Sequence, residues 1–291
     1  MSLHDAIPTI KFSNNKMPVG FPIDEPLIYL DDYFECDSKN NHWIENNGNP
    51  IAGSSSSIAA RESVVEMLVN AEKLLPKGYH FKIFDAYRPI AVQQFLWDYF
   101  RNKKAIENPN LSDVEIYKLT AFCVSFPSYN VLEPSLHNTG GAVDLTIIDS
   151  DGNELDMGCR FDEFTNKAWT NHFEPGCYNG EINEIVRDNR RLLYNVMINV
   201  GFTNLPSEWW HFDYGDDKWA QLNNKTPLYS GILDAKIRNS TPYPNMKKIQ
   251  ELDTQQQKLV SNIIEMRNNC KIISNQITDL INSKKHLTYK K

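Results

Sequence analysis

The stretch Ser135-Leu136-His137-Asn138-Thr139-Gly140-Gly141-Ala142-Val143-Asp144 decides how the rest of this chain is interpreted. A His and an Asp lie seven positions apart, and the Gly-Gly pair between them lets the backbone turn tightly. The run from Ala142 to Ile148 alternates too little for a half-exposed strand, so we predict a strand in the middle of a sheet. His137 and Asp144 can therefore point into one cleft.

A second cluster, Ser207-Glu208-Trp209-Trp210-His211-Phe212, follows later in the chain. The two imidazoles of His137 and His211 and the carboxylate of Asp144 form a three-ligand set for one zinc ion, which leaves a fourth position to water. The ion keeps a net positive charge there and lowers the pKa of that water from about 15.7 to about 7. Glu208 is the predicted general base, so the pattern indicates a zinc peptidase. The alternative is that each is an ordinary polar residue near the surface.

Arg88 is the candidate electrophile, because it follows the predicted strand from His80 to Phe84. A guanidinium at a strand end can hold a developing oxyanion or a substrate carboxylate through two parallel hydrogen bonds. A structural salt bridge to Asp85 explains the spacing equally well. Trp209 and Trp210 either wall the pocket or pack into the core.

Composition is that of a globular protein whose 291 residues suit one large domain, or one domain with an appendage. Hydrophobic residues make up 41% and charged residues 23%, and the net charge of −7 favours neither nucleic acid nor an anionic membrane. No apolar run approaches the roughly 20 residues of a membrane span. The N-terminus lacks the layout of a secretion signal, which leaves a cytoplasmic and a periplasmic location open. Five cysteines without a CxxC pair favour reduced, buried thiols over a disulfide.

Hydrophobic periodicity and turn residues predict the remaining elements. Residues 1–56 are expected to be irregular, with short strands such as Pro26–Tyr29. Helices are predicted over Ser57–Leu75, from Pro89 through Phe100, from the N-cap Ser112 through Phe122, and over residues 181–200, with Gly201 as the stop. The turn at residues 149–152 should form a hairpin, and a last strand is expected near Glu208.

Beyond about Tyr243 the composition changes to an unbroken heptad. Its seam is Ile249, Leu252, Gln256, Leu259, Ile263, Met266, Cys270, Ile273, Ile277 and Leu280. We therefore predict an enzyme domain over residues 1–235 and a helical extension over residues 243–285. The heptad favours a coiled coil that makes a homo-oligomer over a long helix lying on its own domain. Attachment to a cell-surface or secretion partner is a further interpretation.

Five separate motifs resemble those of the D-alanyl-D-alanine dipeptidases of the vancomycin-resistance type, within the zinc D-Ala-D-Ala peptidase superfamily. They follow one another in family order across residues 20–225, namely Phe84–Pro89, Ser135–Thr146, Met157–Asp162, Asn189–Leu192 and Gly201–His211. Several motifs in sequence make this a specific match. The heptad segment departs from the compact family pattern, which bears on the oligomeric state and not on the chemistry.

The resemblance implies hydrolysis of the D-alanyl-D-alanine dipeptide, a building block of the peptidoglycan cell wall. It implies zinc on His137, Asp144 and His211, Glu208 as general base and Arg88 stabilising the transition state. Ser135 and Asp162 would help to bind the dipeptide, Asp162 at its free ammonium group. It also implies a small enclosed site and an α+β fold, in which we expect a central, mostly antiparallel sheet flanked by helices.

Two rival functions stay open. The first is a zinc carboxypeptidase or endopeptidase of the same superfamily that acts on larger cell-wall peptides, which an open cleft would favour. The second is a non-catalytic zinc-binding module whose coiled coil recruits a partner. Glu208 and Arg88 argue against the second, because metal binding alone requires neither. Cell-wall recycling, use of the dipeptide as a nutrient and antibiotic resistance are all compatible with the sequence.

Overall fold

The computed structural model describes residues 2–13, 16–37, 49–176, 183–235 and 237–238 of the 291-residue chain. Residues Met1–Asn239 make up one compact unit. Its described part contains two β-sheets and five α-helices, which confirms the predicted α+β class. The predicted helical extension over residues 243–285, with its coiled coil, lies outside the described residues and stays a prediction.

The central sheet has five strands in the order β2-β4-β5-β7-β6. These strands are β2 (Glu35–Cys36), β4 (His80–Asp85), β5 (Ala142–Ile148), β7 (His211–Asp213) and β6 (Thr203–Asn204). The pairings β4–β5, β5–β7 and β6–β7 are antiparallel, and β2–β4 is parallel. The sheet is therefore mostly antiparallel, as predicted.

Strand β5 is the middle strand of this sheet, and all seven of its residues are buried. Burial of successive side chains means that both faces of the strand are covered, which agrees with its continuous apolar sequence. The predicted turn follows, because Asp149 N donates to Asn153 O at 2.9 Å and Ile148 pairs with Glu154. The chain therefore turns back here, with a short pairing in place of a full hairpin.

A second sheet of three strands includes residues that were predicted to begin the first helix, so the predicted start of that helix is wrong. Its order is β3-β1-β8, with β3 at Ala59–Arg61, β1 at Leu27–Tyr29 and β8 at Ile237–Arg238. The helix expected from Ser57 begins only at Glu62, as α2 (Glu62–Glu72). The reason is that Ala60 pairs with Ile28 of β1, so the backbone of this segment bonds to another strand and not to a helical turn.

The remaining helices are α3 (Ile90–Glu107), α4 (Asp113–Cys123), α5 (Glu184–Asn199) and α6 (Asp217–Asn223). Ser112 caps α4 in a reciprocal capping box with Glu115, as the sequence predicts. Gly201 follows α5 with a φ of 107°, in the left-handed region that favours glycine. Ile185 is 71% exposed, because the buried face of α5 is centred on Val186, Arg190 and Leu193.

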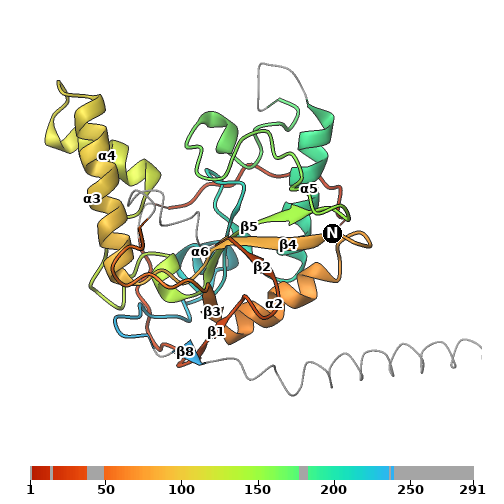
Figure 1. Ribbon diagram of the computed structural model, residues 1–291, viewed down its shortest axis with the longest axis horizontal. Helices are drawn as coiled ribbons and strands as arrows, with labels where there is room; N and C mark the ends of the chain where they lie inside the picture. Colours follow the sequence, from red (N-terminus) through yellow and green to blue (C-terminus); the bar gives the residue numbers. More distant parts are fainter. Residues whose placement is uncertain (1, 14–15, 38–48, 177–182, 236, 239–291) are drawn as a thin grey trace, which may run out of the picture. The chain divides into compact units, whose positions relative to one another are not determined.

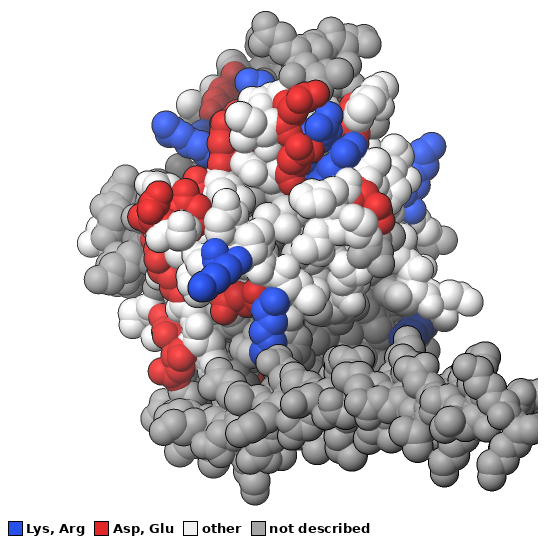
Figure 2. Space-filling view, turned by 90° about the vertical axis from the view of Figure 1, so that its right-hand side faces the viewer, with Lys and Arg blue, Asp and Glu red and all other residues white. Residues whose placement is uncertain are grey.

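Helices α3 and α4 pack against each other and lie to one side of the central sheet (Figure 1). Trp97 and Tyr117 join them with ring centroids 5.1 Å apart. Among the described residues, no helix is both long enough and apolar enough to cross a membrane. On the face shown in Figure 2, acidic side chains follow the left edge, and acidic and basic side chains are interspersed over the rest.

Three cysteines fall within the described residues. Cys36, Cys123 and Cys159 are free thiols, and they are half-buried where full burial was expected. Cys177 and Cys270 lie outside the described residues.

Candidate metal centre

Three neighbouring strands place Asp85, Asp144 and His211 in one row across the central sheet. Asp144 on β5 is the register partner of Asp85 on β4 and of His211 on β7. A register shift between Ile83 and Asp85 brings the Asp85 position into this row. Residues directly opposite each other in a sheet share a face, so strand pairing alone brings Asp144 beside His211.

His137 reaches the same place from a turn. It begins the short 3-10 helix η1 (His137–Thr139), which ends at Gly140 with a left-handed φ of 74°. A Cβ atom on Gly141 would lie 2.2 Å from the carbonyl oxygen of Tyr214, so no larger residue fits there. The two glycines therefore allow the tight connection from His137 into β5 that the sequence predicts.

The three predicted ligands converge. His137 Nε2 lies 3.4 Å from Asp144 Oδ2, and His211 Nδ1 lies 2.9 Å from Asp144 Oδ1. One ligand atom from each residue fits within a 4.8 Å span, and all three side chains are buried. Two nitrogens and a carboxylate oxygen at this spacing could hold one metal ion.

The hydrogen bonds around the ligands support this fit. His137 Nδ1 lies 2.8 Å from the carbonyl oxygen of Ala86, which can only accept, so this nitrogen carries the proton and Nε2 is bare. His211 Nε2 donates to Asp213 Oδ1 at 2.7 Å, so Nδ1 is the ring nitrogen left for a metal ion. Asp144 Oδ1 and His211 Nδ1 are buried without a well-formed hydrogen bond to any described residue. A cation would satisfy these atoms together.

The charged forms of Asp144 and His211 stabilise each other. Burial disfavours the Asp144 carboxylate, but His137 and His211 outweigh burial and hold the pKa of Asp144 below its usual value. Burial also disfavours a charged His211, yet Asp213 and Asp144 raise the pKa of His211 well above its usual value. The metal-free centre therefore holds a proton on His211 that a divalent cation would displace.

Glu208 lies beside the centre on the turn that leads into β7. Its backbone N–H donates to Leu205 O at 3.0 Å, and its carbonyl accepts from His211 N at 3.2 Å. Glu208 Oε2 is 3.9 Å from His211 Nδ1. Burial first, and then the charge of Asp144, raises the pKa of Glu208 to about 7, although the nearby cations oppose the rise. A carboxyl group with this pKa can both accept and return a proton near neutral pH.

Arg88 makes the predicted salt bridge to Asp85, and its role as the electrophile stays a prediction. Its Nε and Nη2 atoms donate to Asp85 Oδ2 at 2.9 Å and 2.5 Å, and Nη1 donates to Gln93 Oε1 at 3.0 Å. The salt bridge to Asp85 therefore exists. Burial opposes the charge, but Asp85, Asp144 and Asp162 together raise the pKa of Arg88, so the guanidinium also faces the carboxylates of the centre. With three N–H groups engaged in these bonds, two of the five remain to face a substrate.

Ser135 and Asp162, the predicted substrate residues, both have special local geometry. Ser135 is 4% exposed, and its hydroxyl has no hydrogen-bond partner among the described residues. Asp162 has a φ of 58°, a left-handed conformation that costs a non-glycine residue of order 1–3 kcal/mol. The loop is supported because Phe161 stacks on Phe84 with ring centroids 4.5 Å apart.

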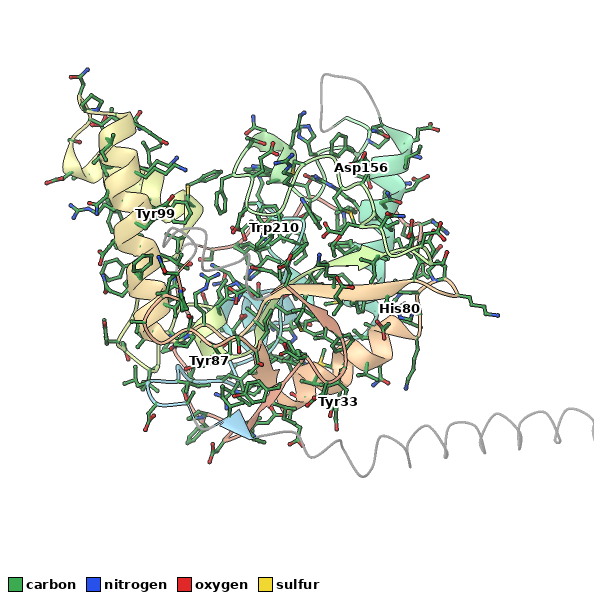
Figure 3. The ribbon with its side chains drawn as sticks, in the orientation of Figure 1. Tyr33, His80, Tyr87, Tyr99, Asp156 and Trp210 are labelled. Carbon is green, nitrogen blue, oxygen red and sulfur yellow. The ribbon has the colours of Figure 1, made fainter. Side chains whose placement is uncertain are left out.

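Trp209 and Trp210 are both core residues, 3% and 0% exposed. Trp210 lies beside β5 near the middle of Figure 3, and its carbonyl accepts from Leu145 N at 3.1 Å. Its ring contacts Phe161 at a centroid distance of 5.4 Å. Trp210 therefore packs against the loop that carries Asp162.

Two supporting residues were missed by sequence reasoning. Asp213 lies two positions after His211, and alternation along a strand puts both on one face, so the sequence carried this signal. Gln93 carried no local signal. Its amide reaches Arg88 and donates to Ser125 O at 2.6 Å, contacts that only the packing of α3 creates.

Comparison with known proteins matches these motifs to one family. The family described as D-ala-D-ala dipeptidase matches residues 38–229. A D-alanyl-D-alanine dipeptidase of Synechocystis sp. is 35% identical over 167 residues, which cover 53% of this chain and 68% of the relative. The D-alanyl-D-alanine dipeptidase of Enterococcus faecium is 29% identical over 208 residues, which cover 70% of this chain and 95% of the relative.

Among solved structures, VanYB in complex with D-Alanine-D-Alanine is similar with a TM-score of 0.35 at 15% identity, over 59% of this chain and 82% of that one. The family match extends over more than half of the chain and includes every predicted ligand. The chain therefore belongs to the D-ala-D-ala dipeptidase family of M15 metallopeptidases.

Proposed function

We propose that this chain is a zinc-dependent dipeptidase that hydrolyses D-alanyl-D-alanine to two molecules of D-alanine. The observation that carries the proposal is the convergence of His137, Asp144 and His211, with Glu208 3.9 Å from His211. The names of the relatives support the choice of substrate.

The metal would be held by His137 Nε2, His211 Nδ1 and Asp144. When bound, zinc acts as a Lewis acid that acidifies water and polarises a carbonyl group. Glu208 takes a proton from the attacking water as the new C–O bond forms. It returns that proton to the amide nitrogen as the C–N bond breaks, so the two products are a carboxylic acid and an amine. A pKa near 7 suits both transfers.

Arg88 supplies positive charge where the carbonyl oxygen becomes negative. Asp85 and Gln93 fix the guanidinium in advance, so it needs no reorganisation when charge develops on the substrate. Asp162 would hold the free ammonium group of the dipeptide, and Ser135 would donate a hydrogen bond to an oxygen of the dipeptide. This arrangement would favour substrates whose terminal groups are free and charged.

The test is incubation of zinc-loaded protein with D-Ala-D-Ala, L-Ala-L-Ala and a pentapeptide that ends in D-Ala-D-Ala, followed by a chiral assay of free alanine. We expect release of D-alanine from the first dipeptide alone. The zinc-stripped protein is the control and should release none. Cleavage of the pentapeptide without cleavage of the dipeptide would overturn the substrate choice.

One observation favours the rival that acts on larger peptides. A groove of about 570 Å³ includes Ser135, Phe126 and Tyr129 in its lining. This is room for more than two alanine residues next to the predicted substrate-binding serine. The pentapeptide in the same assay decides between the two functions, since a carboxypeptidase would release a single D-alanine from it.

A further inference from the structure

The two histidines of the centre are held by different kinds of partner. His137 donates to a backbone carbonyl, which is neutral, whereas His211 donates to the carboxylate of Asp213 at 2.7 Å. Asp213 is completely buried, and among the described residues no N–H group or hydroxyl donates to its second oxygen, Oδ2. Burial of a carboxylate oxygen without a hydrogen-bond donor is unfavourable, so the second oxygen of Asp213 requires a donor from a neighbouring side chain.

Asp216 is that partner. It is 1% exposed and caps helix α6, where Oδ1 accepts from Trp219 N at 3.0 Å. Its other oxygen is buried, and the side chain lies within hydrogen-bonding reach of Asp213. Two carboxylates in contact cannot both stay ionised. Burial, and next the charge of Asp213, raises the pKa of Asp216 well above its usual value, so Asp216 carries the proton.

The turn between the two aspartates is rigid, which fixes their separation. Tyr214 N donates to Gly141 O at 3.0 Å, just after the η1 turn that carries His137. Gly215 has a φ of 71°, and a Cβ atom there would lie 2.5 Å from Cε2 of the Tyr229 ring. The turn that joins Asp213 to Asp216 is therefore bonded to Gly141 and packed closely against Tyr229.

We propose that Asp216 is a positioning residue of the metal centre, whose carboxyl group donates a hydrogen bond to Asp213 and so holds Asp213 against His211 Nε2. His211 is then kept with Nε2 protonated and Nδ1 directed at the metal. This inference rests on the proposed function, because it concerns the same centre. Outer partners of metal-bound histidines typically change metal affinity about 10- to 100-fold.

The test compares three single variants by metal affinity, measured for zinc by competition with a chromophoric chelator. Asp216→Asn keeps the oxygen that caps α6 and offers an N–H group to Asp213. Asp216→Ser also caps a helix well, but its hydroxyl lies one bond closer to the backbone than the carboxyl oxygens of Asp216, so it no longer reaches Asp213 and Asp213 loses its donor. Asp217→Asn is the matched control, since Asp217 is the next residue and contacts Met17 N and Gln221.

We expect Asp216→Asn and Asp217→Asn to bind zinc within about threefold of wild type, and Asp216→Ser to bind about 10- to 100-fold more weakly. The absorption spectrum of the Co²⁺-loaded protein should change in Asp216→Ser alone, because only there does the His211 ring lose its orientation. Wild-type affinity in Asp216→Ser would overturn the proposal. Equal loss in Asp216→Asn and Asp216→Ser would also overturn it.

A second measurement keeps the proposal testable even where Asp216→Ser does not fold. The infrared C=O stretch of a protonated carboxyl group is measured at neutral pH in the Glu208→Gln background, because Glu208, with a pKa of about 7, would add a band of its own. In that background the band should be present while Asp216 is intact, absent in Asp216→Asn and retained in Asp217→Asn. Its absence while Asp216 is intact would overturn the proposal. Failure of wild-type protein to bind zinc would instead refute the proposed function, and the infrared band would still report the Asp216 proton.

Discussion

The strand side and the turn side of the candidate metal centre are built differently. On the strand side, Asp144 and His211 are register partners on β5 and β7, so two strands in register suffice to bring them together. On the turn side, His137 depends on several distant segments. Ala86 O accepts from its ring, and Arg61 of β3 donates through Nε to Thr139 O at 2.9 Å. Strand pairing positions Asp144 and His211 through the regular backbone hydrogen bonds of the sheet. The turn that carries His137 instead needs a separate hydrogen bond from another segment for each group that it positions.

The substitution Asp144→Asn should break the strand side with the largest effect. Asp144 faces both imidazoles, so its loss removes a ligand and the charge that both rings face. We expect zinc affinity to fall more than about 100-fold, beyond the range for outer partners, and turnover to be lost. Chelator competition measures this. Thr146→Val, on the same face of β5, removes a hydroxyl without a partner among the described residues and should leave affinity unchanged.

Glu208→Gln should leave the metal ligands of both sides in place and lower the rate of hydrolysis. The carboxyl lies beside the ligand atoms and is not one of the three, so we expect zinc affinity within a few-fold of wild type. The loss of a general base should lower kcat by about 10²- to 10⁴-fold. Isothermal titration and a steady-state assay separate the two quantities. A parallel loss of affinity would show Glu208 to be a ligand and not a base.

Arg61→Met should loosen the turn side alone. The buried guanidinium donates to the carbonyls of Thr139 and Glu25, and both would lose their partner. At about 1–2 kcal/mol for each unsatisfied carbonyl, we expect the free energy of unfolding to fall by about 2–4 kcal/mol. Urea unfolding measures it, with Lys73→Met, an exposed cation at the end of α2, as the control. Zinc affinity should fall less than in Asp144→Asn, and an equal fall would erase the contrast between the two sides.

The pH dependence of stability should give the smallest effect. The pKa of Glu208 is about 7 in the folded metal-free protein, against 4.5 for an ordinary Glu. The folded state therefore binds more protons between these values, so this group makes the protein less stable as pH rises from about 4.5 to about 7. At about 1.4 kcal/mol for each pH unit, we expect a change of about 2–3 kcal/mol across this window. Glu208→Gln should remove this contribution to the slope, which urea unfolding of both proteins at several pH values would detect, and an unchanged slope would refute the assignment.

Much of the strand side could be predicted from the sequence. The apolar run of β5 identified the middle strand, and His137, Asp144 and His211 were identified by residue type and spacing. The cap of α4 at Ser112 and the glycine after α5 were also predicted, because each depends on contacts within a few residues. Hydrogen bonds of this kind join residues only a few positions apart, so they depend little on how the rest of the chain folds.

The tertiary structure alone decided the rest. Ala59–Arg61 became a strand in place of a helix because β1 offered it backbone partners. The bare nitrogen of each histidine was set by Ala86 and Asp213, and the pKa of Glu208 was set by burial. Each of these depends on groups that are distant in sequence or on exclusion of water. Residue types and spacing therefore determined which chemistry this chain could perform, and packing decided which atoms face the metal and which carboxyl groups keep a proton.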